Sequence, residues 1–208
     1  MAIKNIIFDL GGVILNINYQ LTIQAFHQLG ATHFVQDFTK NPEHAFFIDF
    51  EIGKITAAQF RNSLRECLKL TVSDQVLDNA WNALLLDLPG ERLTILRTLK
   101  QQYRIFLYSN TNEIHINEVF NICQRQHQLK SLNELFEQAY YSHILGARKP
   151  NPEGYLAILK ENNLKPDETV FVDDLYLNIQ GAQQVGLQTI HINEQQTMLV
   201  VPDLIKQL

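Results

Sequence analysis

Four short apolar segments, each ending in polar residues, constrain the fold of this 208-residue chain more than any other feature. They are NIIFDL (5–10), YRIFLYSN (103–110), TVFVDD (169–174) and LQTIHI (187–192). None alternates cleanly between apolar and polar residues, which is typical of strands that are covered on both faces. We therefore expect these segments to form a sheet that is buried between layers of helices.

Amphipathic helical patterns lie between the segments, at 90–102, 112–127 and 151–163. In the last of these, Asn151 is placed as the N-cap and Pro152 as the first helical residue, a position that suits proline. Its apolar face comprises Tyr155, Ile158 and Leu159. Strands that alternate with helices predict an α/β fold with a doubly wound parallel sheet.

Residues 18–88 interrupt this alternation, because the whole segment has helical or loop patterns. One of its helices is expected from Thr56 onward, where Thr56 and Gln59 have the spacing of a capping box. An insertion of this length after a first strand is typical of a lid. We expect a small all-helical cap domain at 18–88 and an α/β core domain formed by 1–17 and 89–208.

The composition is that of an ordinary globular protein, with 46% hydrophobic and 19% charged residues. A formal net charge of −5 and scattered basic residues argue against non-specific binding to nucleic acid. The short apolar stretch near the N-terminus runs into Asp9, which excludes a signal peptide or a membrane span there. Cys67 and Cys123 lie in helical patterns and suggest a reducing compartment. We expect a cytoplasmic protein with neither a nucleic-acid nor a membrane partner.

Polar side chains end three of the expected strands, at the edge where open parallel sheets bind ligands. They are Asp9, Ser109, Asn110, Asp173 and Asp174, and the loop GARKPNP (146–152) adds Lys149. Adjacent acids at a strand end favour a hard divalent cation such as Mg²⁺, although one acid at this position is also a common helix cap. Likewise, Ser109 and Asn110 suit either a phosphate oxygen or a helix start, and an isolated lysine is usually a surface residue.

Taken together and in this order, the motifs resemble the haloacid dehalogenase-like (HAD) hydrolase superfamily. They are FDLGGVI (8–14), YSNTN (108–112), RKPNPEGY (148–155) and FVDDLYLNIQGA (171–182). The chain is most similar to the branch that contains bacterial α-glucose-1-phosphate phosphatases and the phosphatase domain of soluble epoxide hydrolases. The resemblance implies a Rossmann-like core, a helical cap and Mg²⁺ as cofactor.

The resemblance also implies roles for individual residues. Asp9 would be the nucleophile, forming an aspartyl-phosphate that water hydrolyses. Mg²⁺ would be bound by Asp9, Asp174 and the backbone carbonyl of Gly11, with Asp173 beside the metal or one water away. The phosphoryl oxygens would be bound by Ser109, Asn110 and Lys149, and Lys149 would offset the charge of Asp9. Asn178 would orient these groups.

Candidates for the cap side of the site are Tyr19, Phe46, Phe47 and Glu51, although burial within the cap is the better expectation for the two phenylalanines. Gly11 is a departure, since family phosphatases usually carry there an aspartate that handles protons, which contributes about 10²–10⁴-fold to the rate. Three interpretations follow: a Mg²⁺-dependent phosphatase of a small phosphorylated metabolite such as a sugar phosphate, a metal-independent 2-haloacid dehalogenase, and a phosphate-binding regulatory protein with weak turnover.

Overall fold

A parallel sheet forms the centre of the protein. The computed structural model describes residues 2–34, 44–193 and 196–208. Five strands pair in the order β3-β2-β1-β4-β5, and all neighbouring pairs are parallel. The strands are β1 (Asn5–Phe8), β2 (Arg104–Ser109), β3 (Gln138–Tyr141), β4 (Thr169–Asp173) and β5 (Gln188–His191). The predicted doubly wound α/β fold is confirmed, and so are the four predicted strands.

Edge strand β3 is the strand of this sheet that the sequence patterns miss. Its sequence, QAYY, has only four residues and begins with the exposed Gln138. A short tract with one exposed end carries little of the signal by which a buried strand is predicted. Its register is nevertheless well defined, because Tyr140 pairs with Tyr108 and Tyr141 pairs with Ser109 at the ligand-binding edge.

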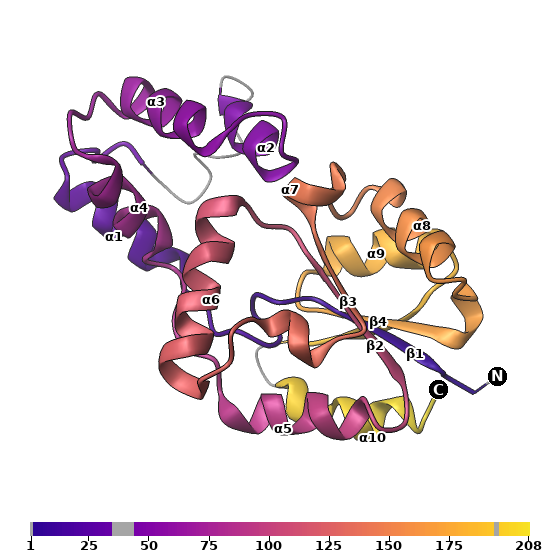
Figure 1. Ribbon diagram of the computed structural model, residues 1–208. Coiled ribbons are helices and arrows are strands. Elements are labelled where there is room, and N and C mark those ends of the chain that lie inside the picture. Colours follow the sequence, from indigo (N-terminus) through magenta and orange to yellow (C-terminus); the bar gives the residue numbers. More distant parts are fainter. Residues whose placement is uncertain (1, 35–43, 194–195) are drawn as a thin grey trace.

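Helices cover both faces of the sheet (Figure 1). One face packs against α5 (Gly90–Leu99), α6 (Glu113–His127) and α10 (Val201–Ile205), together with the short helices η3 (Leu132–Leu135) and η5 (Met198–Val200). The other face packs against α8 (Pro152–Glu161) and α9 (Tyr176–Gln184). The remaining short helices of the core are α7 (Ser142–Leu145) and η4 (Pro166–Glu168). The core is therefore a three-layer α/β/α structure.

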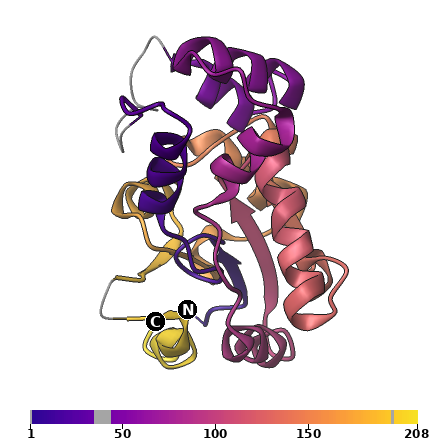
Figure 2. The ribbon, with the colours of Figure 1, turned by 90° about the vertical axis from the view of Figure 1, so that its left-hand side faces the viewer.

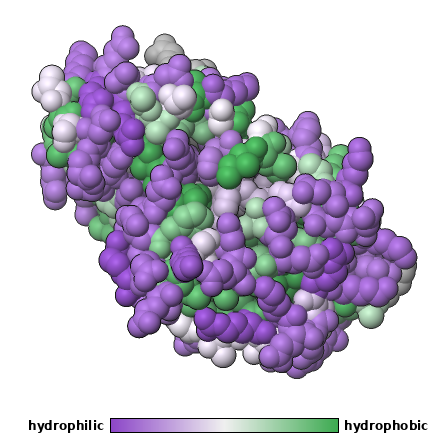
Figure 3. Space-filling model, in the orientation of Figure 1, coloured by the Kyte–Doolittle hydropathy of each residue, from purple (hydrophilic) through white to green (hydrophobic). Residues whose placement is uncertain are grey.

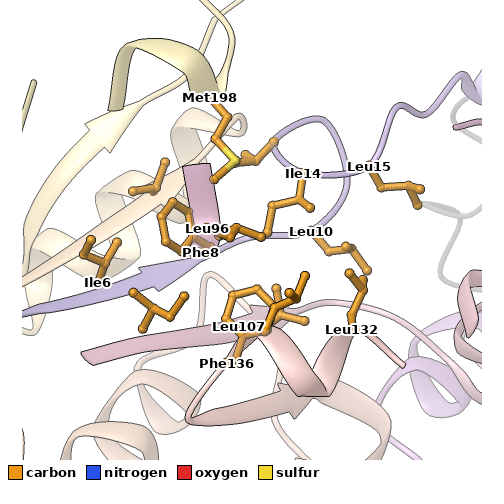
Figure 4. Close-up of a cluster of buried hydrophobic side chains, with 14 of the residues drawn as sticks. Ile6, Phe8, Leu10, Ile14, Leu15, Leu96, Leu107, Leu132, Phe136 and Met198 are labelled. Atoms are coloured by element: carbon orange, nitrogen blue, oxygen red, sulfur yellow. The ribbon is translucent and has the colours of Figure 1, made fainter. Parts of the chain in front are cut away.

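Strand β1 shows how one sequence supplies both faces. Ile6 and Phe8 point into the cluster on the α5 side, where Figure 4 shows them beside Leu96 and Leu107. Ile7, between them, joins the cluster with α8 and α9. All three β1 residues are fully buried, and each such side chain contributes about 1.5–3 kcal/mol to folding. Burial on both faces explains why the strand has no polar alternation.

Helix α8 begins as its sequence indicates, with one difference. Pro152 is the first helical residue, and Asn151 occupies the N-cap position, but the Asn151 side chain makes no capping hydrogen bond. The expected apolar face is buried, since Tyr155, Ile158 and Leu159 lie in the cluster beneath α8 and α9.

The segment between β1 and α5 contains α1 (Tyr19–Gln28), α2 (Phe46–Glu51), α3 (Ala57–Leu68) and α4 (Asp74–Asn82). These helices share a hydrophobic cluster of their own, joined by Ile114 of α6. The capping box of Thr56 and Gln59 is present at the start of α3. We call helices α1 to α4 the cap, which lies above the carboxyl edge of the sheet in Figure 2. The limits 18 and 88 remain a prediction, and 35–43 within them lie outside the described residues.

The chain enters and leaves the cap through two paired segments. The Asn16 N–H donates to the Asp87 carbonyl at 2.9 Å, the Leu86 N–H donates to the Asn16 carbonyl at 3.0 Å, and Ile17 and Leu85 form an antiparallel bridge.

Polar residues cover most of the face seen in Figure 3. Among the described residues, none of the helices combines the length and apolar character needed to cross a membrane.

Candidate active site

Asp9 and Lys149 form the buried centre of the candidate site. Asp9 directly follows β1, and its N–H donates to the Val172 carbonyl of β4 at 2.8 Å, which fixes the turn. The Lys149 ammonium donates to Asp9 Oδ1 at 2.5 Å and to Asp173 Oδ2 at 2.7 Å. Only 1% of Lys149 is exposed. A lysine so buried is held charged by its two carboxylate partners. The alternative expectation, that Lys149 is an ordinary surface lysine, is therefore wrong.

Burial shapes the electrostatics of these groups. It raises the pKa of Asp9 to about 7, a shift that Lys149 opposes and that Asp173 and Asp174 reinforce. It also raises the pKa of Asp174 to about 6, with Asp173 adding to the effect. For Lys149, burial acts to lower the pKa, but attraction to Asp173 and Asp9 outweighs it and holds the pKa above its usual value. Three clustered acids facing one ammonium thus leave an excess of negative charge.

The carboxylates fit a divalent cation. Asp9, Asp173 and Asp174 each offer one oxygen, and these oxygens lie within 4.8 Å of one another. The Asp174 carboxylate lies against Gly12, where a Cβ atom would be 2.2 Å from Asp174 Oδ2. Gly12 also has φ +77°, so both its backbone conformation and the close approach require glycine. Clustered carboxylate oxygens with excess negative charge are the donor set that Mg²⁺ prefers.

Asp173 has a different environment from the other two acids. Its Oδ1 accepts hydrogen bonds from the Leu175 N–H at 2.8 Å and from Asn178 Nδ2 at 3.0 Å, and its Oδ2 accepts from Lys149. Tyr155 in turn donates to the Asn178 carbonyl at 2.8 Å. Asp173 is therefore occupied in positioning Lys149, and Asn178 orients Asp173. Asp9 and Asp174 are better placed as direct metal ligands.

The acidic pair does not cap the following helix with Asp174. Helix α9 has Leu175 as its N-cap residue and makes no side-chain capping bond there. The alternative interpretation of Asp174 as a helix cap thus has no support in the structure. The metal-binding interpretation of Asp174 stays a prediction, as does that of the Gly11 carbonyl.

The end of β2 brings Ser109 and Asn110 to the same edge. Ser109 is 4% exposed and lies between the ends of β1 and β3. Asn110 Nδ2 donates to the Lys149 carbonyl and Asn110 Oδ1 accepts from the Lys149 N–H, both at 2.9 Å. The Asn110 side chain thus holds the backbone of Lys149, a role that the sequence does not indicate. The predicted phosphate contacts of Ser109, Asn110 and Lys149 remain predictions.

Ser142 is a further residue that sequence reasoning misses. Its hydroxyl donates to the Thr111 carbonyl at 2.9 Å and accepts from the Thr111 N–H at 2.8 Å, which ties the loop after β2 to the start of α7. Because β3 was not predicted, nothing in the sequence placed Ser142 at this edge. Asn112 caps α6 by accepting from the His115 N–H at 3.0 Å.

The cap candidates divide into two pairs. Phe46 and Phe47 stack at 4.3 Å between ring centroids within the hydrophobic cluster of the cap, which agrees with burial rather than with substrate contact. Glu51, in contrast, forms an ion pair with Arg148, and Tyr19 lies in the electrostatic field of Asp9, Asp174 and Glu51. Of the four candidates, Glu51 is therefore the one that contacts the loop of Lys149, and Tyr19 is the one whose pKa responds to the acids of the site.

Comparison with known proteins supports the class of protein that this fold and site define. A family model described as haloacid dehalogenase-like hydrolase matches residues 3–186. The chain belongs to this family of hydrolases.

Individual relatives are similar over nearly the whole length. A D-ribitol-5-phosphate phosphatase from Bacteroides thetaiotaomicron is 31% identical over 187 residues, 90% of each chain. A HAD-family enzyme from the same organism, in complex with magnesium and inorganic phosphate, has a TM-score of 0.83 and 34% identity, covering 92% of this chain and 94% of that one. A structure described as a predicted HAD-like family hydrolase from Porphyromonas gingivalis has a TM-score of 0.86 and 27% identity, covering 100% and 98%.

Proposed function

We propose that this protein is a Mg²⁺-dependent phosphatase that hydrolyses a small phosphorylated metabolite through an aspartyl-phosphate on Asp9. The observation that carries the proposal is the buried Asp9 at the end of β1, held by Lys149 at 2.5 Å beside two further carboxylates. The phosphatase relative and the neighbouring structure with magnesium and phosphate support the same reaction. D-Ribitol 5-phosphate is accordingly a first candidate substrate.

The chain's own residues account for the first chemical step. Lys149 holds Asp9 Oδ1, which leaves Oδ2 to attack the phosphorus atom, so that a P–O bond to Asp9 forms and the ester P–O bond breaks. The departing oxygen takes a proton from solvent water. A second water molecule then attacks the phosphorus of the aspartyl-phosphate, breaks its bond to Asp9 and gives a proton to the solvent, which releases inorganic phosphate and restores Asp9. Ser109 and Lys149 would bind phosphoryl oxygens, which carry the negative charge of the transition state.

The carboxylates of Asp9 and Asp174 suit a divalent cation. Asp9 and Asp174 would bind it directly, and when bound it neutralises charge on the transferring phosphoryl group. Asn178 and Asp173 keep Lys149 in position beside it.

Gly11 limits the choice of leaving group. Glycine at position 11 supplies no acid to protonate the leaving oxygen, a contribution of about 10²–10⁴-fold in other enzymes. A Cβ atom at this position would lie 3.1 Å from Ile17 Cδ1, so a side chain there would require Ile17 to shift slightly. Substrates with a good leaving group, such as aryl phosphates or sugar 1-phosphates, are expected to lose the least rate from the missing acid.

The test is phosphate release by the purified protein from p-nitrophenyl phosphate and from a panel of sugar and polyol phosphates. We expect release with Mg²⁺, none with EDTA, and none from Asp9→Asn. Glu66→Gln, an exposed change in α3 of the cap, serves as the matched control. Release that survives Asp9→Asn would falsify the nucleophile assignment. Metal-independent halide release from 2-haloacids would instead favour a dehalogenase, and beryllofluoride binding without turnover would favour a regulatory protein.

A further inference from the structure

An ion pair joins the cap to the catalytic loop. Glu51 is the last residue of α2, and Arg148 immediately precedes Lys149. Glu51 Oε2 and Arg148 Nε are 2.9 Å apart, and the two side chains are only 22% and 32% exposed. The pair is thus partly buried, and one of its members is the direct neighbour of the residue that holds Asp9.

The end of α2 is seated firmly on the core. Gly53 has φ +71°, and a Cβ atom there would lie 2.0 Å from the His143 carbonyl oxygen of α7. This contact is possible only for glycine and sets the distance between the two helices. Glu51, two residues earlier, therefore has a defined position over the catalytic loop, while Asn110 holds Lys149 from the other side.

The ion pair leaves hydrogen-bonding capacity unused. Arg148 Nε is buried and, among the described residues, makes no aligned hydrogen bond despite its closeness to Glu51. Elsewhere in the cap, Arg61 binds Asp78 through two hydrogen bonds of 2.8 Å, the geometry that satisfies both groups. A carboxylate offers about four acceptor sites, so Glu51 can accept from a further donor.

We propose that Glu51 and Arg148 form a hydroxyl-binding subsite that selects phosphates of polyhydroxylated carbon chains, that is, polyols or sugars. Neighbouring hydroxyl groups on such a chain donate to a carboxylate and accept from a guanidinium. A plain alkyl chain would leave these groups desolvated and unpaired, which disfavours it. The inference rests on the proposed phosphatase function and names the substrate class of the same site.

The experiment compares two substrates of equal chain length, D-ribitol 5-phosphate and n-pentyl phosphate, which differ in four hydroxyl groups. If D-ribitol 5-phosphate is a poor substrate, the best polyol or sugar phosphate of the panel takes its place. It is then compared with the alkyl phosphate of the same chain length that lacks its hydroxyl groups. We expect the wild-type kcat/KM to favour the hydroxylated member. Glu51→Gln should lower that kcat/KM by about 10- to 100-fold, the effect of losing a hydrogen bond to a charged group. Its effect on n-pentyl phosphate should be below about threefold, and Glu66→Gln should change neither.

Several results would overturn the subsite. These are equal kcat/KM for both substrates in the wild type, and an equal loss for both in Glu51→Gln. A third is a double variant, Glu51→Arg with Arg148→Glu, that regains the wild-type kcat/KM on the hydroxylated substrate. That result would show that the ion pair only holds the cap on the core. Failure of the phosphatase proposal looks different, because p-nitrophenyl phosphate would then not be hydrolysed, or Asp9→Asn would keep its activity.

Discussion

The cap and the core place their polar groups in opposite ways. In the core, Lys149 and Asp173 are almost completely buried, and each has several charged or polar partners. In the cap, the buried residues are mostly apolar or aromatic, and its best-formed ion pair, Arg61 with Asp78, is only partly buried. The core thus has the rigid charges that a reaction needs, whereas the cap meets the site through a few side chains at its edge. Substitutions in the two regions should have different consequences.

The largest effect is expected for Lys149→Met. Removing one partner of a buried ion pair costs about 3–5 kcal/mol, since it leaves Asp9 and Asp173 without compensation. We expect a matching decrease in the free energy of unfolding, measured by urea denaturation, and a loss of phosphatase activity on every substrate. The exposed Lys160→Met in α8 is the control. An unchanged free energy of unfolding would show that the buried charges are not paired as described.

A second comparison uses two leucines that are equally buried. Leu96 of α5 belongs to the core cluster and Leu64 of α3 to the cap cluster, with exposures of 0% and 1%. Each change to alanine should cost about 2–5 kcal/mol of unfolding free energy. If the cap and the core unfold independently, circular dichroism will show that Leu64→Ala splits the unfolding curve into two transitions, because the weakened cap unfolds before the core. In Leu96→Ala the core is weakened instead, so it will no longer be the more stable part. A single shifted transition in both variants would show that they unfold as one unit.

Acid should weaken the contact between the regions. His115 of α6 stacks on Trp81 of α4 at 5.0 Å between ring centroids, and burial lowers its pKa to about 3. The unfolded chain binds a proton near pH 6.5 and the folded chain does not, so the stability from this residue is present above pH 6.5 and is lost as pH falls toward 3. At pH 5 the loss is about 2 kcal/mol. His115→Gln should reduce the pH dependence of unfolding by that amount, and an unchanged slope would contradict the assignment.

The smallest expected effect separates two exposed threonines. Thr56 caps α3 in the cap, and its change to alanine should cost about 1 kcal/mol. Thr94 of α5 in the core donates to the Gly90 carbonyl within its own helix, so Thr94→Ala should stay within about 0.5 kcal/mol of wild type. Thermal unfolding of both variants measures the difference, and equal shifts would count against the capping box.

The sequence predicts the parts of this site that depend on strand ends. Asp9, Ser109 and Asp173 follow apolar segments, and parallel strands bring their carboxyl ends to one edge, so their proximity follows from topology alone. The contact of Asn110 with the backbone of Lys149 does not follow from topology, because it depends on how two loops meet. The pairing of Glu51 with Arg148 is likewise set by packing of the cap on the core, which no local pattern encodes.

The paired entry and exit of the cap bear on how such a chain arises and can be rebuilt. Because Ile17 and Leu85 lie side by side, the core closes at nearly the same point whether or not the intervening helices are present. A segment with adjacent ends behaves as an exchangeable module, and insertions of this kind are tolerated. Transplanting a cap from a relative between Ile17 and Leu85 is thus a route to new substrate preference on an unchanged catalytic core.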